Sequence, residues 1–388
     1  MRTGIVVAIL LFLSCTIAFA TPADSNTDEI NRQVLDVVSV NQINQFINNV
    51  NKELNQDLPP LSLETVKEIA AKGIDNNWRE LSQSLMMRFI KETTANLQLM
   101  GKLLFLAVLC ALLQNLQNSF ENSSIALLSY SVCFVFLTVI ALTAFYNALE
   151  MVRQTVSTIV GFMEALLPLL LSLLVGMGAF TSAALFTPLM LFVVSAVSVL
   201  IKDVILPLLF LTGVLECVNY LSDKYRVANL ASLFKQLSIV TLGFTLVLFI
   251  GIITIQGVAG GVADGLALRT AKFATTTFVP FVGKMFSDTV ELVAGASLLM
   301  KNSVGIFGVV TILLICALPL IKLVSLIFVI KIAGALVQPM GDEKMAKCLD
   351  GIGNNLWLVF GALATVVLML FLAITMIVGA GSMALMLR

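Results

Sequence analysis

Long apolar runs determine what class of protein this chain can be. Of its 388 residues, 59% are hydrophobic and only 12% are charged, whereas charged residues make up ~25% of a typical soluble domain. A soluble fold of this size could not bury so much apolar surface, so much of that surface has to face lipid. The sequence therefore predicts an integral membrane protein that crosses the bilayer several times.

The membrane part is predicted to cover residues 97–388 and to be all-α. A helix over 125–149 would be ~37 Å long, enough to cross a hydrocarbon core of ~30 Å with some tilt. The predicted spans are 125–149, 165–180, 182–201, 204–221, 239–263, 304–321 and 356–387. Two shorter runs, 103–113 and 323–330, are either spans or interfacial helices, so we expect about six to eight spans.

The N-terminus has the pattern of a cleavable secretory signal peptide over residues 1–20. Arg2 provides a positive charge, residues 5–17 form the apolar segment, and Ala18-Phe19-Ala20 matches the small-x-small cleavage pattern. An uncleaved anchor helix is the alternative. Because a signal peptide directs export, the residues that follow it are expected outside the cytoplasm.

The segment 21–96 is the large polar region of the chain. Its apolar residues recur at the three- and four-residue spacing of amphipathic helices, with a stop at Pro59-Pro60. We therefore predict a small exported helical domain in front of the membrane part. Two or three helices are marginal as an independent fold, so this domain is expected to pack on the membrane part or on a partner.

The run 103–113 decides on which side of the membrane the later loops lie. If it spans, three Lys and Arg residues of the predicted loops are cytoplasmic and six are outside, against the usual excess of basic residues in cytoplasmic loops. The three are Lys224, Arg226 and Lys235, and the six are Arg153, Lys202, Arg269, Lys272, Lys284 and Lys301. If it does not span, the two groups exchange sides, and the sequence favours this second arrangement.

Composition excludes several classes of function. The chain has no histidine, so catalytic triads, metal sites and proteases that depend on histidine are excluded. Its formal net charge is zero, which gives no electrostatic support for binding nucleic acid. It contains no GxxxxGK[ST] phosphate loop. We therefore predict no enzymatic activity, no catalytic residues, no metal and no cofactor.

An amphipathic element is predicted at 264–303, between two of the spans. Pro280 and Gly283 are expected to break it, and Lys284, Asp288 and Glu291 share one helical face. We interpret it either as an interfacial connecting helix with paired charges or as a re-entrant, pore-lining element, since non-helical backbone at membrane depth has to be covered by protein or water. Its candidate pore or coupling residues are Asp264, Arg269, Lys272, Lys284, Asp288 and Glu291.

Two further candidates, Glu164 and Glu216, lie within or at the edge of apolar runs. A charge at the centre of a span costs ~2.5–3.5 kcal/mol on insertion scales, so such residues usually face the interior of a helix bundle. Lys202-Asp203 and Lys322 are candidate partners for them. The alternative is that both glutamates lie near the membrane surface and reach water.

Several local sequences resemble the stage III sporulation protein AE family of endospore-forming bacteria, and the resemblance covers nearly the whole chain. The most specific stretch begins at Gly261-Val262-Ala263-Asp264-Gly265, continues through 268–273, and includes 282–288. Residues 298–302, 314–317 and Gln338-Pro339 also match. The family has no catalytic residues that could be transferred to this chain.

The resemblance implies a membrane component of a channel-like, secretion-like complex that links mother cell and forespore. The protein would lie in the mother-cell membrane around the forespore, with 21–96 facing the space between the two membranes. Its implied partners are other proteins of the same sporulation operon, including a cytoplasmic secretion-type ATPase and ring-forming proteins, and a forespore membrane protein. A non-conducting scaffold that anchors the other subunits is the alternative.

Overall fold

The computed structural model of the chain describes residues 78–119, 123–221, 227–278, 282–340 and 343–386. Its elements are α5 (Trp78–Ala95), α6 (Leu97–Ser119), α7 (Ser123–Gly176), α8 (Phe180–Val199), the π-helical turn η3 (Leu200–Ile205), α9 (Leu206–Leu221), α10 (Ala228–Phe278), α11 (Val282–Val337), the 3-10 turn η4 (Gln338–Met340) and α12 (Glu343–Met386). Every element of the described part is helical, so the all-α prediction is confirmed there. The predicted signal peptide and residues 21–77 lie outside the described residues.

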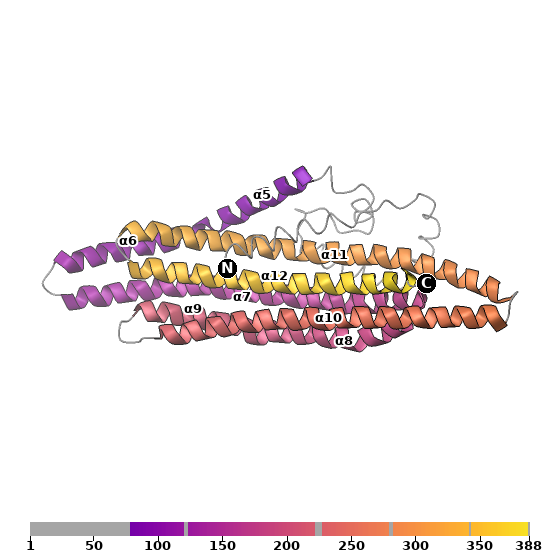
Figure 1. Cartoon of the computed structure of the whole chain (residues 1–388). Helices are drawn as coiled ribbons and strands as arrows, with labels where there is room; N and C mark the ends of the chain where they lie inside the picture. Colours follow the sequence, from indigo (N-terminus) through magenta and orange to yellow (C-terminus); the bar gives the residue numbers. More distant parts are fainter. Residues whose placement is uncertain (1–77, 120–122, 222–226, 279–281, 341–342, 387–388) are drawn as a thin grey trace.

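The long helices run lengthwise in one antiparallel bundle (Figure 1). α8 and α9 follow each other end to end, and α5 leaves the bundle at an angle (Figure 1). α7 and α12 form the centre, because 56% of the most apolar stretch of each is buried, against 17% for α10. Aromatic contacts join neighbouring helices, as between Phe162 of α7 and Phe307 of α11, whose ring centroids lie 6.4 Å apart.

In the described part of the chain, six helical stretches are long and apolar enough to cross a membrane, at the lower end of the predicted number. They are Leu85–Leu113, Leu128–Gly176, Phe180–Leu221, Ala228–Ala267, Val293–Val337 and Glu343–Ala380. The longest has 49 residues, which corresponds to ~73 Å of helix. A hydrocarbon core is only ~30 Å thick, so most of these helices are far longer than a single crossing requires.

The predicted division of α7 into the spans 125–149 and 165–180 is wrong, because residues 150–164 are helical and continue the same helix. This segment is amphipathic, with Val152 and Val156 buried and Arg153 and Ser157 exposed. A helix continues through a polar stretch when one of its faces still packs on the core. The polar residues therefore mark a face of the helix and not its end.

The predicted loop at Lys202-Asp203 is also wrong. These residues lie in the π-helical turn Leu200–Ile205, which joins α8 to α9 without leaving the helix axis. Asp203 forms an ion pair with Arg153 of α7 at 3.0 Å, and Lys202 Nζ donates to Ser157 Oγ at 3.1 Å. These side chains therefore form a polar belt, made of Arg153, Ser157, Lys202 and Asp203, halfway along the bundle.

The two runs that the sequence left open both lie inside longer helices. Residues 103–113 belong to the candidate span Leu85–Leu113, which has 29 residues, and residues 323–330 belong to α11. The shortness of 103–113 is thus no reason to exclude it as a span. Because 150–164 and 202–203 are not loops, the count of their basic residues does not indicate which loops are cytoplasmic. The side of the membrane on which each loop lies stays a prediction.

The predicted element 264–303 consists of the end of α10 and the beginning of α11. Residues 264–278 continue α10 and residues 282–303 open α11, so Gly283 lies within a helix, while Pro280 lies outside the described residues. Whether these two helix ends line a pore stays a prediction.

Candidate functional site

Charged side chains from four helices meet near one end of the bundle. Glu216 comes from α9, Lys235 from α10, Lys331 from α11 and Asp350 from α12, together with Asn354 and Asn355 of α12. We call this set the four-helix network. Charged residues are rarely enclosed between helices unless they are paired, so this network, which joins four helices, is the best candidate for a functional site.

The first half of the network is built around Glu216. Its Oε1 accepts from Lys235 Nζ at 3.4 Å, and its Oε2 accepts from Asn355 Nδ2 at 2.9 Å. The side chains of Glu216 and Lys235 are mostly enclosed, with 21% and 31% of their surface exposed. Of the two partners predicted for Glu216, neither Lys202 nor Lys322 is used.

The second half is built around Lys331. Its Nζ donates to Asp350 Oδ1 and to Asn354 Oδ1 at 2.8 Å. Asn354 Nδ2 in turn donates to Asp350 Oδ2 at 2.9 Å. The three side chains thus form a closed triangle that joins α11 to α12, with the Asp350 side chain 56% exposed.

Two glycines of α12 make room for this network. A Cβ on Gly351 would lie 2.8 Å from Glu216 Oε2, and one on Gly353 would lie 3.0 Å from Lys331 Cε. Real Cβ atoms essentially never approach other atoms as closely as the first of these distances. The Gly351-Ile352-Gly353 sequence therefore lets one glutamate and one lysine approach the α12 backbone.

Beside the network lies a polar cavity of about 340 Å³ between α9, α10 and α12. Glu216, Tyr220, Lys235, Lys347 and Asp350 line part of its wall. Both signs of charge are present, so the cavity offers donors and acceptors to a polar group of either sign. In the described part of the chain, no group of three or more Cys, Asp or Glu side chains is close enough to hold a metal ion.

Gly351→Val tests how tightly the network is packed. The new side chain should displace the Glu216 carboxylate and break its bonds to Lys235 and Asn355, destabilising the folded protein by about 1–3 kcal/mol. Denaturant titration of the purified protein in detergent micelles measures the effect. Gly361→Val is the matched control, because a Cβ at Gly361 of the same helix meets nothing within 4 Å. Equal losses in the two variants would show that the network is not tightly packed.

Asp264 occupies a different place from the other candidates. It is buried, with 1% of its surface exposed, and its two carboxylate oxygens accept from the backbone N–H groups of Thr181 at 2.7 Å and Ser182 at 2.9 Å. The N-cap of α8, Ala179, has no side chain that could satisfy these groups. Asp264 of α10 therefore caps α8 from a neighbouring helix.

Glu164 lies on the exposed surface of α7 and accepts a hydrogen bond from Ser195 Oγ of α8 at 3.3 Å. Arg269 is exposed near the end of α10. For Lys272, Lys284, Asp288 and Glu291 the backbone is helical, but their side chains are outside those that the structure describes. The structure thus brings Glu216 into a network and leaves Glu164 and Asp264 at two separate places.

Most of the network could not be predicted from the sequence. Lys331 follows the apolar run 323–330, whereas Asp350, Asn354 and Asn355 lie in the polar stretch before the run 356–387 and carry no distinguishing signal. Lys301 was predicted to lie in a loop, but it is fully buried in α11, and its Nζ has no hydrogen-bond partner among the described residues.

Comparison with known proteins gives a consistent result. A family model described as Stage III sporulation protein AE matches residues 62–381, a range that contains the whole four-helix network. The Stage III sporulation protein AE of Bacillus subtilis (strain 168) is 37% identical over 351 residues, which cover 90% of this chain and 88% of that protein. No solved structure matches the chain.

Proposed function

Because this chain belongs to the stage III sporulation protein AE family, we propose that it is a membrane subunit of a multi-protein, channel-like complex between mother cell and forespore that endospore development requires. Its place among multi-pass membrane proteins of a sporulation family follows from the family match and from the six candidate spans of the described residues. The role in a complex rests on one observation about the surface of α10.

α10 exposes large apolar side chains along most of its length. They include Leu233, Phe244, Ile255 and Leu266, which are 55%, 62%, 71% and 62% exposed. Leu233 and Leu266 are separated by ~50 Å along the helix, whereas one hydrocarbon core covers ~30 Å. Apolar surface that lipid does not cover has to be covered by protein. This observation supports a subunit that works inside an assembly.

The partners in this proposal are those implied by the family resemblance: other proteins of the same operon, including a cytoplasmic secretion-type ATPase and ring-forming proteins, and a forespore membrane protein. The location in this proposal is the mother-cell membrane around the forespore. No enzymatic step is part of the proposal.

Photo-crosslinking along α10 tests it. A benzophenone amino acid is placed singly at Leu233, Phe244, Ile255 or Leu266 in the full chain, in sporulating cells. We expect a contiguous part of the series to crosslink to lipid and at least one end position to crosslink to a protein encoded in the same operon. If all four positions crosslink to lipid alone, protein does not cover α10 and the proposal is wrong.

A non-conducting scaffold is the second candidate function, and the closed pairing within the four-helix network favours it. Each charge of the network is matched by one of the opposite sign, an arrangement suited to locking four helices together. Glu216→Gln separates the two functions: a channel role predicts fewer spores with the complex still assembled, whereas a scaffold role predicts that spore numbers fall only where assembly is also lost. Co-purification of the operon proteins with the variant reports assembly.

A further inference from the structure

One face of α7 carries polar and small residues along the part of the bundle between the polar belt and the turn after Gly176. They follow one another at intervals of three or four residues, the spacing of a single helical face. The set is Arg153, Ser157, Gly161, Glu164, Pro168 and Ser172, all at least partly exposed or lining a surface groove. We call it the α7 polar face.

Glu164 lies at the middle of this part of the bundle. The polar belt at Arg153 is eleven residues, or ~16 Å, before it, and the turn after Gly176 begins twelve residues, or ~18 Å, after it. The belt pair Arg153 and Asp203 is exposed, at 52% and 50%, as expected of charges at the boundary of an apolar layer. The layer between belt and turn thus has about the thickness of a hydrocarbon core, with Glu164 at half depth.

Among the described residues, the Glu164 carboxylate has no partner of opposite charge. It accepts a hydrogen bond from the Ser195 hydroxyl at 3.3 Å, and no described Lys or Arg lies within ion-pair distance of it. Pro168 has no N–H to donate to the Glu164 carbonyl, so this backbone group also loses its helical hydrogen bond. An exposed carboxylate at this depth, on a residue whose carbonyl lacks its usual helical donor, calls for a donor from outside the chain.

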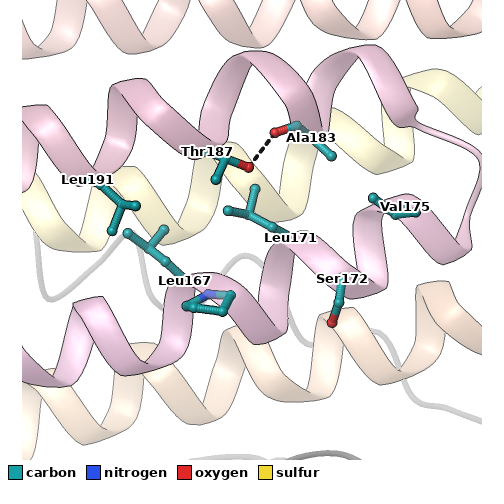
Figure 2. A pocket seen from close by; sticks show the side chains of 8 residues that line it. Leu167, Leu171, Ser172, Val175, Ala183, Thr187 and Leu191 are labelled. Carbon is teal, nitrogen blue, oxygen red and sulfur yellow. Dashed lines mark hydrogen bonds between the residues drawn. The ribbon is translucent and has the colours of Figure 1, made fainter.

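A groove between α7 and α8 extends from Pro168, one helical turn after Glu164, to Val175 near the turn (Figure 2). It has a volume of about 270 Å³, and Leu167, Leu171, Thr187 and Leu191 form much of its wall. The Thr187 hydroxyl already donates to the Ala183 carbonyl at 2.6 Å, so the groove is mainly apolar (Figure 2). Gly161 has no side chain, and a Cβ there would meet nothing within 4 Å, so another helix can approach α7 closely at this point.

We propose that the α7–α8 groove binds one transmembrane helix of a partner subunit, and that this helix carries a Lys or Arg at mid-membrane depth which pairs with Glu164. Apolar side chains of the helix fill the groove, Gly161 allows close packing, and the uncompensated carboxylate selects the cation. This proposal rests on the proposed function, since it assumes that the chain works within a membrane assembly.

The test uses the labelled full-length protein in phosphatidylcholine vesicles and synthetic transmembrane helices of about 20 Leu and Ala residues. Three peptides differ at their central residue, which is Lys, norleucine or Glu. Energy transfer should report binding of the Lys peptide, and Glu164→Gln should weaken this binding about tenfold. Glu92→Gln is the matched control, because Glu92 lies on α5, away from the groove, and should leave binding unchanged.

Four results would overturn the proposal. The first is that the norleucine or Glu peptide binds as tightly as the Lys peptide. The second is that Glu164→Gln leaves binding of the Lys peptide unchanged. The third is that two labelled copies of the chain associate through Glu164, because a second copy would then occupy the groove. The fourth is that a membrane-impermeant thiol reagent labels Ser157→Cys and Ser172→Cys in the full complex, because water would then occupy the groove. If the peptides bind without selectivity but the α10 crosslinks to operon proteins are still found, the groove proposal is wrong and the proposed function is still supported.

Discussion

Asp264→Ala should destabilise the folded protein by about 3–5 kcal/mol, the largest loss expected from any single substitution considered for this chain. The change removes two charge-assisted hydrogen bonds and leaves the backbone N–H groups of Thr181 and Ser182 without an acceptor at the start of α8. Each orphaned buried donor costs about 1–3 kcal/mol. Denaturant titration in detergent micelles measures the loss.

Two variants control this experiment. Asp264→Asn keeps one acceptor oxygen and should lose about half as much stability. Asp203→Ala removes an aspartate whose side chain is 50% exposed, and exposed ion pairs contribute at most about 1 kcal/mol. Similar losses for Asp264→Ala and Asp203→Ala would show that Asp264 does not cap α8.

Lys301→Met should have the opposite effect and stabilise the protein by about 2–3 kcal/mol. Lys301 is fully buried in α11, and its Nζ has no hydrogen-bond partner among the described residues. Placing a lysine within a membrane span costs about 2.5–3.5 kcal/mol, and methionine fills a similar volume without a charge. The same denaturant titration at neutral pH gives the sign of the change.

Lys331→Met is the matched control on the same helix. It removes an amine that is bonded to Asp350 and Asn354, so it should destabilise the protein by about 1–2 kcal/mol. The two lysine variants thus have opposite signs. A loss of stability in Lys301→Met would mean that Lys301 makes a favourable interaction in the membrane. The interpretation of Lys301 as a buried amine without a partner among the described residues would then be wrong.

The sequence predicts the class of fold well and the length of the helices poorly, for one physical reason. Apolar runs identify membrane helices because lipid tolerates few polar residues. When helices are predicted from apolar runs, a polar stretch is interpreted as a loop. α7 nevertheless continues through residues 150–164, because Val152 and Val156 still pack on the core. Distinguishing an amphipathic continuation from a loop requires knowing which faces are buried.

The candidate site shows a similar limit. Glu216 could be found from the sequence because it stands alone in an apolar run, but its partner Lys235 depends on which side of α10 packs against α9. Asp264 was found as well, whereas its role as a cap depends on contacts with Thr181 and Ser182, more than eighty residues away in sequence. Local patterns identify unusual residues, and tertiary packing assigns what they do.

The π-helical turn Leu200–Ile205 has a consequence for how this chain tolerates insertions and deletions. A π turn holds more residues than an α turn, so it accommodates one extra residue without breaking the helix. Deleting one residue there should convert the junction into a regular α-helix and leave α9 at nearly the same rotation about its axis, so Glu216 would still face Lys235. Deleting one residue from the regular part of α9, between this junction and Glu216, would instead rotate Glu216 by roughly 100° away from Lys235. Single-residue deletions should therefore be tolerated at this junction and harmful within α9.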